Sequence, residues 1–272
     1  FDTFFTDLYD ACEAMDIPAD TAISEAGPGQ FELNLMHQPD ALKAADDTWF
    51  FKMLVKGLAR SHGFAASFMA KPYSLWSGNG MHMHFSILDE AGRNIFNDGS
   101  EKGSAAMRAA VAGCLAALPG STLIFAPHAN SYERLVPNAH APTGIGWAFE
   151  NRTAALRIPA SGPAARRIEH RVAGGDVNPY LSIAAVLGAA LIGIEDGMSP
   201  DEPIIGNAYA QSLAQLPATW NLAINTFAED PLIRRIFDEE LIENYLMTKR
   251  QEVHYMAELS EQEQTELYLD TV

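Results

Sequence analysis

One segment constrains this chain more than any other: a glycine-rich turn followed by a stretch in which polar and apolar side chains alternate. It reads Ser77-Gly-Asn-Gly-Met-His-Met-His-Phe-Ser86. A period of two predicts a β-strand, so we expect His82, His84 and Ser86 to project from one face of a sheet. Gly78 and Gly80 carry no side chain, which lets the backbone amides of the turn approach a phosphate closely. Two imidazoles and a hydroxyl beside such a turn indicate a binding site rather than an ordinary strand.

The rest of the chain divides into helical and extended segments. Apolar spacing and capping residues predict helices over residues 1–16, 40–61, 104–118 and 178–195, and more helix between 229 and 258. Extended segments are predicted over 23–35, over 65–88 as two strands, and at 146–149, 154–158 and 167–172. Because no repeat, low-complexity tract or clear linker interrupts this order, we expect one α+β domain over residues 1–272.

Composition excludes several classes of protein. The 18 Lys+Arg against 35 Asp+Glu give a net charge of −17, so no nucleic-acid partner and no anionic membrane surface is expected. Hydrophobic residues make up 48% of the chain, enough for a core. No uninterrupted apolar run reaches the roughly 20 residues of a membrane span. Cys12 and Cys114 lie far apart, so we expect neither a disulfide framework nor a zinc site, and a cytoplasmic location.

The few basic residues are concentrated in one part of the chain. Six of the 18 fall within 38 positions, and all six are arginines: Arg134, Arg152, Arg157, Arg166, Arg167 and Arg171. Arginine binds carboxylate and phosphate groups through two parallel hydrogen bonds. This segment therefore indicates an anion-binding site, and the alternative interpretation is a surface face of ion pairs.

Carboxylates complete the chemistry. Glu25 and Glu32 flank a Gly-Pro-Gly bend, and hard cations such as Mg²⁺ and Mn²⁺ prefer carboxylate oxygen, with Mn²⁺ also accepting imidazole. Two solvated side chains are the alternative. In an extended segment Arg167, Glu169 and Arg171 share a face, so we expect the Glu169 carboxylate to lie between two guanidinium groups and to have a lowered pKa. Together these patterns suggest ATP-dependent phosphoryl transfer assisted by a divalent metal.

These motifs, in this order and spacing, resemble the catalytic domain of the glutamine synthetase family along essentially the whole chain. The resemblance is carried by the glycine-rich segment, Asn130-Ser-Tyr-Glu-Arg134-Leu-Val-Pro137, Asn151 to Pro159, and Arg166-Arg-Ile-Glu169 with Asn178-Pro-Tyr. Within the family the chain is most similar to the γ-glutamylpolyamine, or γ-glutamylputrescine, synthetase branch. The resemblance implies an α+β fold with a curved antiparallel sheet flanked by helices. It also implies a homo-oligomer of stacked rings.

The resemblance further implies a two-step ligase reaction. ATP phosphorylates the γ-carboxylate of glutamate, and an amine (a polyamine or another primary amine) or ammonia then displaces phosphate. The implied metal ligands for Mg²⁺ or Mn²⁺ are Glu25, Glu32, His82 and Glu169. The implied ATP contacts are His84, Ser86 and Arg167, with Gly78 and Gly80 in the phosphate turn. Arg134 would bind the glutamate carboxylate, and the groups implied around the transferring phosphoryl are Arg152, Arg157 and Arg171.

Three positions depart from the family pattern. His140 stands where ammonia-using members carry a glutamate in a flap over the site, and a neutral imidazole attracts a cation less strongly than a carboxylate. Ala164 replaces a family lysine, and Ser77 replaces an asparagine that helps hold glutamate. We therefore expect either an acceptor larger than ammonia, with His140 near it, or an altered activity, rather than ammonia-specific glutamine synthesis.

The resemblance also bears on the extent of the protein. Family members precede this region with a small β-grasp domain and a strand bearing two further metal-binding glutamates, which are absent from the chain that begins at Phe1. We expect the chain to be the catalytic portion of a longer protein.

Two alternative functions remain open at this point. A phosphagen-kinase-like phosphotransferase has a related catalytic domain. A catalytically impaired glutamine-synthetase-like protein would act in binding or assembly.

Overall fold

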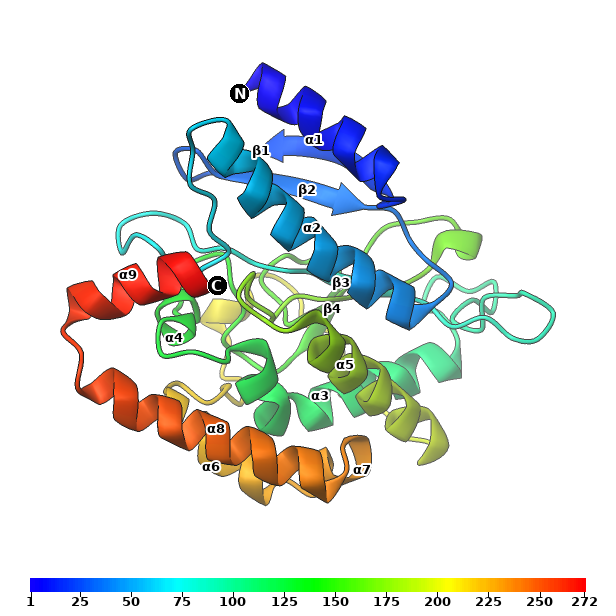
Figure 1. The fold of residues 1–272 in the computed structure, drawn as a ribbon. Helices are drawn as coiled ribbons and strands as arrows, with labels where there is room; N and C mark the ends of the chain where they lie inside the picture. The colour runs from blue at the N-terminus through cyan, green and yellow to red at the C-terminus, as the bar shows by residue number, and fades with distance from the viewer.

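The N-terminal quarter of the chain forms a small unit with its own core. The computed structural model describes residues 1–272. Helix α1 (Asp2–Ala14), the hairpin of β1 (Ala19–Ser24) with β2 (Phe31–Leu35), and helix α2 (Ala41–Ser61) lie together at the top of Figure 1. Apolar side chains from α1, α2 and the segment between α1 and β1 pack into a cluster: Phe4, Leu8, Cys12, Ile17 and Ala59. The hairpin turns at the predicted Gly-Pro-Gly bend.

Local signals set the limits of α2 as the sequence predicted. The side chain of Asp40 accepts hydrogen bonds from the backbone amides of Leu42 and Lys43, so it caps the helix. Gly63, with φ of 77°, lies two residues beyond the last helical position, where the left-handed conformation ends the helix readily. The helix therefore begins and ends within one residue of the expected bounds.

The central sheet is short, four-stranded and mixed. Its order is β3 (Met83–Phe85), β6 (Ile168–His170), β5 (Leu156–Ile158) and β4 (Trp147–Phe149). The β3–β6 and β6–β5 pairs are antiparallel, but β4 and β5 run parallel, so the expectation of an antiparallel sheet is wrong for that pair. The two strands expected over 65–88 reduce to β3, preceded by a single bridge between Gly80 and Gly174.

Helices supply most of the larger core of 39 buried residues, to which the strands of this sheet also contribute. They are α3 (Ala105–Phe125), α4 (Ser131–Arg134), α5 (Pro179–Glu195), α6 (Trp220–Glu229), α7 (Ile233–Ile236), α8 (Glu239–Ala257) and α9 (Glu261–Thr271). Short 3₁₀ turns, η1 (Pro163–Ala165) and η2 (Ala208–Ala210), lie in the connections. In Figure 1 helices α6, α7 and α8 lie on the side of the molecule opposite the N-terminal unit, whereas α9 lies between α8 and that unit.

Three of the longer helices differ from the prediction, and one of them, α6, falls before the region between 229 and 258 where helix was expected. Helix α3 continues through Pro119 to Phe125, because Leu123, Ile124 and Phe125 are buried in the core and their burial outweighs the backbone hydrogen bond that proline removes. Helix α9 was not predicted. Its signal is nonetheless present, since Ser260 and the residue three positions on form a reciprocal capping box.

Helices α3 and α5 cross in close contact through a pair of glycines. A Cβ atom on Gly113 would lie 2.1 Å from the carbonyl oxygen of Ala189, and one on Gly193 would lie 2.1 Å from that of Ala109. The two backbones can therefore touch only where side chains are missing.

Helix α3 is also long and apolar enough to cross a membrane by length and composition. Its apolar window has a mean hydropathy of 1.4, and 78% of that window is buried inside the protein. Such burial is the behaviour of a core helix.

Candidate active site

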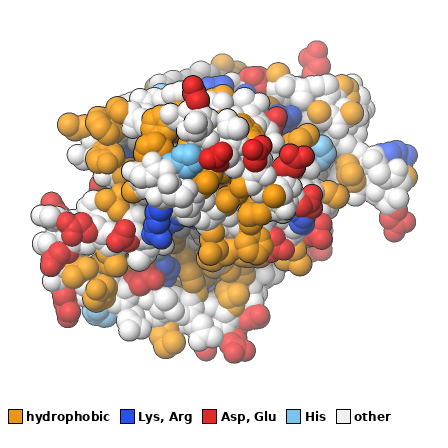
Figure 2. Space-filling model, turned by 45° about the horizontal axis from the view of Figure 1, so that its top comes forward, with side chains coloured by type: hydrophobic (Ala, Val, Ile, Leu, Met, Phe, Trp, Pro, Cys, Tyr) orange, Lys and Arg blue, Asp and Glu red, His pale blue; other side chains and the backbone are white.

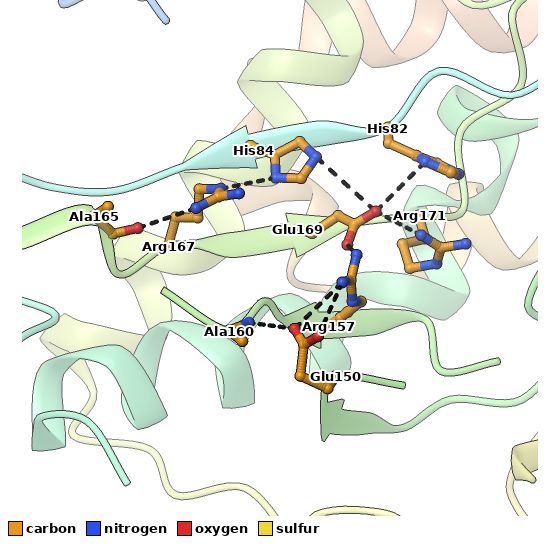
Figure 3. A network of polar contacts seen from close by, with 9 residues as sticks. All are labelled: His82, His84, Glu150, Arg157, Ala160, Ala165, Arg167, Glu169 and Arg171. Atoms are coloured by element: carbon orange, nitrogen blue, oxygen red, sulfur yellow. Dashed lines mark hydrogen bonds and ion pairs between the residues drawn. The ribbon is translucent and has the colours of Figure 1, made fainter. Parts of the chain in front are cut away.

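Glu169 lies at the centre of a polar network that spans three neighbouring strands (Figure 3). Strand pairing sets His84 of β3 directly opposite Glu169 of β6, and Arg157 of β5 on its other side. The Oε1 atom of Glu169 lies 2.5 Å from Nη1 of Arg171, 3.4 Å from Nδ1 of His82 and 3.9 Å from Nε2 of His84. Its Oε2 atom lies 2.8 Å from Nη1 of Arg157. Four side chains predicted from three motifs, His82, His84, Arg157 and Arg171, thus meet at the carboxylate of Glu169.

The charges around Glu169 hold it ionised. Burial alone raises the pKa of this carboxyl, but the charge of Arg171 and the hydrogen bond from Arg157 act in the opposite direction, and the pKa lies below its ordinary value. The predicted lowering is therefore confirmed. The second guanidinium is Arg157 rather than the expected Arg167, which lies before β6 and donates from Nε to Nδ1 of His84 over 3.2 Å.

His84 in β3 and His82, which directly precedes this strand, are neutral in this surrounding. Desolvation, followed by the charge of Arg171, lowers the pKa of His82 to about 3, and desolvation also lowers that of His84. Along residues 81–87 the polar side chains are exposed while Met83 and Phe85 pack against the core, so the predicted common face of His82, His84 and Ser86 is present. A neutral imidazole keeps the lone pair with which it binds a metal ion.

A second group of carboxylates lies on the N-terminal hairpin. Glu32 sits in β2 opposite Ile23, and Glu25 follows the end of β1. Burial, then the charge and hydrogen bonding of Glu25, then the charge of Glu169, raise the pKa of Glu32, while Arg152 acts in the opposite direction. The hairpin carboxylates therefore adjoin one another and lie within electrostatic reach of the sheet cluster.

A residue that the motifs did not single out joins these two groups. The Oε1 atom of Gln30 accepts a hydrogen bond from the amide of Gly27 over 3.0 Å, and its Nε2 atom donates to the carbonyl oxygen of Gly78 over 2.9 Å. Its one side chain thus bridges the bend beside Glu25 and the turn before His82. Because the contact spans 48 positions, no local pattern could have revealed it.

The donor atoms suit a hard divalent cation in type. Carboxylate oxygens with a neutral imidazole nitrogen are ligands that Mn²⁺ accepts, and carboxylates suit Mg²⁺. An adjoining pair of carboxylates also favours a positive charge between them. The structure does not gather three His, Cys, Asp or Glu side chains into one metal-binding group, and the two oxygens of Glu169 are engaged by arginines.

Arg134 is held in a buried position beside the glycine-rich turn. It is 4% exposed, and its Nη1 atom donates to the carbonyl oxygen of Val172 over 2.7 Å. Burial lowers its pKa to about 10, while Asp176 acts in the opposite direction, so it remains a cation at neutral pH. A Cβ on Gly78 would lie 2.9 Å from Cγ of Arg134, and one on Gly80 would lie 2.8 Å from its Nη2. The glycines therefore make room for this arginine.

The remaining predicted residues are exposed. Ser86, Arg152 and His140 make no hydrogen bond to another protein group, and His140 lies in the loop after α4 with φ of 60°. Glu150 was missed by the sequence analysis. It has φ of 50°, and its carboxylate accepts hydrogen bonds from Nη2 of Arg157 over 3.2 Å and from the amide of Ala160. Such a backbone conformation in a residue other than glycine is commonly found at functional sites.

Comparison with known proteins confirms the α+β fold. The family described as glutamine synthetase, catalytic domain, matches residues 1–268. The γ-glutamylputrescine synthetase of Escherichia coli (strain K12) is 37% identical over 253 residues, which cover 93% of this chain and 54% of that protein. A glutamate–isopropylamine ligase from a Pseudomonas species is 39% identical over 254 residues, covering 92% and 55%.

A solved structure shows the same architecture. A complex of GmaS with ADP matches with a TM-score of 0.86 and 32% identity, covering 96% of this chain and 62% of that one. This chain spans about half the length of the curated relatives named above.

Proposed function

Because this chain belongs to the glutamine synthetase family, we propose that it provides the catalytic domain of an ATP-dependent ligase that joins the γ-carboxylate of glutamate to an amine. The observation that carries the proposal is the meeting of His82, His84, Arg157 and Arg171 at the carboxylate of Glu169. Cations, neutral imidazoles and an ionised carboxylate at one place are what phosphoryl transfer to a carboxylate requires. Relatives named for putrescine and isopropylamine support an organic amine as the acceptor.

The proposed reaction has two steps. An oxygen of the glutamate γ-carboxylate attacks the terminal phosphorus of ATP, and ADP leaves with the bond electrons. The nitrogen of the amine then attacks the carbonyl carbon of the γ-glutamyl phosphate, phosphate leaves, and the nitrogen loses a proton. The product is a γ-glutamylamide.

The chain's own residues bind and orient the reactants in this proposal. Arg134 holds the carboxylate of glutamate, and Arg152 and Arg157 neutralise charge on the phosphoryl group as it transfers. Arg171 lies next to the acyl phosphate. The remaining ATP contacts are made by His84, Ser86, Arg167, Gly78 and Gly80.

A divalent cation belongs to the proposal as well. Mg²⁺ or Mn²⁺ would neutralise charge on the phosphates, and the residues that would hold it are Glu25, Glu32, His82 and Glu169. Their donor types fit, as described above.

Assembly into a homo-oligomer in the cytoplasm is also part of the proposal, with residues 1–272 acting as one catalytic domain. Figure 2 shows hydrophobic side chains gathered on the face that carries the N-terminal unit, among acidic ones. On α2 the side chains of Trp49, Phe50 and Met53 are 42%, 49% and 59% exposed. Exposed apolar groups of this size support contact with another subunit.

The test uses the full-length protein with glutamate, ATP, Mg²⁺ or Mn²⁺, and a panel of ammonia, primary amines and polyamines. We expect equal amounts of ADP, phosphate and a γ-glutamylamide identified by mass spectrometry. If no acceptor in the panel yields an amide, the proposal is contradicted. A phosphagen-kinase-like enzyme would instead give a stable phosphorylated guanidine without free phosphate. An impaired protein would bind Mn²⁺ and an ATP analogue in calorimetry without turnover.

Replacing His140 with glutamate is expected to shift the acceptor preference toward ammonia. A carboxylate attracts ammonium more strongly than an imidazole does, and an exposed charge pair contributes about 0.2–1 kcal/mol. We expect the ratio of kcat/KM for ammonia to that for the preferred amine to rise about two- to fivefold. The control is His254→Glu, which makes the same change on an exposed position of α8. An unchanged ratio in His140→Glu would show that this residue does not face the acceptor.

A further inference from the structure

The loop that carries His140, residues 137–142, is held in an unusual conformation. Asn138 and His140 have φ of 65° and 60°, in the left-handed region that residues other than glycine rarely occupy. Such conformations persist where the surrounding structure holds them. Two of them within three positions mean that something outside the loop determines its shape.

One hydrogen bond joins this loop to a part of the chain distant in sequence. The hydroxyl of Tyr209, in η2, donates to the carbonyl oxygen of Ala141 over 2.8 Å. The other hydrogen bond made by the loop is local, from the amide of Ala139 to the carbonyl oxygen of Val136. Ala141 is 1% exposed and Tyr209 is half-buried, so the acceptor end of this bond lies inside the protein.

The segment that bears Tyr209 is itself fastened to the sheet side of the site. The amide of Ile204 donates to Trp147 in β4, and the amide of Leu216 donates to Thr143, over 2.8 and 2.9 Å. Between them the amide of Ala208 donates to Oγ1 of Thr153 over 2.9 Å. Tyr209 therefore connects the loop to a segment that is itself held by hydrogen bonds to residues 143, 147 and 153.

Tyr209 also stands near the catalytic arginines. Burial raises the pKa of its hydroxyl, while the charges of Arg171 and Arg134 act in the opposite direction. The hydroxyl is therefore protonated at neutral pH and available as a donor. Its closeness to both arginines places the attachment of the loop beside the groups assigned to glutamate and the acyl phosphate.

We propose that Tyr209 is a positioning residue that, through Ala141, fixes the loop bearing His140 and thereby sets the selectivity for the amine acceptor. The inference rests on the proposed function, because it takes the loop to cover the acceptor. Tyr209 acts through the loop and does not touch the reacting atoms. If the hydroxyl of Tyr209 is removed, the loop loses its one hydrogen bond to a segment distant in sequence. His140 is then no longer held in a fixed position.

The test compares Tyr209→Phe with Tyr245→Phe in the full-length protein. The control removes the same kind of bond, since the hydroxyl of Tyr245 donates to the carbonyl oxygen of Leu123 over 3.1 Å, inside the helical core. For Tyr209→Phe we expect the KM for the amine to rise about two- to tenfold. This factor corresponds to the free energy that one hydrogen bond contributes. The KM values for glutamate and ATP stay unchanged, and amide exchange over 137–142 becomes faster. Tyr245→Phe changes none of these.

The outcomes separate the inference from the function it rests on. A wild-type protein that forms no γ-glutamylamide overturns the proposed function, and hydrogen exchange over 137–142 still decides whether Tyr209 anchors the loop. An active wild type with Tyr209→Phe matching Tyr245→Phe in amine KM and in exchange overturns the inference. Equal rises in the KM for amine, glutamate and ATP also overturn it, because they indicate general loss of structure.

Discussion

Replacing Glu169 with glutamine is expected to abolish ligase activity and to lower the free energy of unfolding by about 3–5 kcal/mol. The side chain of Glu169 is 3% exposed and contacts Arg157 and Arg171. Removing one partner of a buried ion pair leaves uncompensated charge in a region of low dielectric constant. Glutamine has the same shape as glutamate but no charge, so the variant isolates the electrostatic effect. Urea unfolding measures the change in stability, and a phosphate-release assay measures the loss of activity.

Glu150→Gln is the matched control for this prediction. Glu150 also contacts Arg157, over 3.2 Å, but its side chain is 50% exposed. Exposed pairs contribute about 0–1 kcal/mol because water screens them, so the stability of this variant should change little. Equal losses of stability in the two variants would show that the buried network around Glu169 does not stabilise the fold through its charge.

Replacing Gly113 with alanine is expected to lower the free energy of unfolding by about 3 kcal/mol. The added methyl group would meet the backbone of α5 at Ala189, which cannot move without separating the two helices. Gly57→Ala in α2 is the control, since a Cβ there meets nothing within 4 Å. That change should raise stability by about 0.5–1 kcal/mol through helix propensity. Gains of similar size in both variants, measured by urea unfolding, would contradict the close crossing.

The site residues whose positions could be predicted from the sequence are those placed by local periodicity. Alternation along residues 81–86 is enough to place His82 and His84 on one face, and the register of β3 with β6 then brings both to Glu169. The same reasoning assigned Arg167 to the carboxylate, and there it was wrong. The arginine that contacts Glu169 is set by the strand that pairs with β6. The order of strands in a sheet cannot be predicted from any single segment of the sequence.

Contacts between distant segments explain the other differences. Gln30 and Tyr209 act on partners 48 and 68 positions away, so each looks unremarkable within its own segment. The end of α3 was misplaced because proline is a local signal for a helix end, whereas burial of Phe125 is a property of the assembled core. Family resemblance supplied the roles of residues whose chemistry periodicity cannot define, such as the exposed Arg152.

The division of the molecule into two hydrophobic cores has a consequence for its energetics. Glu25 and Glu32 belong to the unit with the small core, whereas His82 and Glu169 belong to the sheet beside the large one. Any ligand that binds both groups adds its binding free energy to the docking of one unit against the other. A saturating ligand would therefore hold the two units together. The temperature at which the N-terminal unit separates from the rest would depend on ligand concentration.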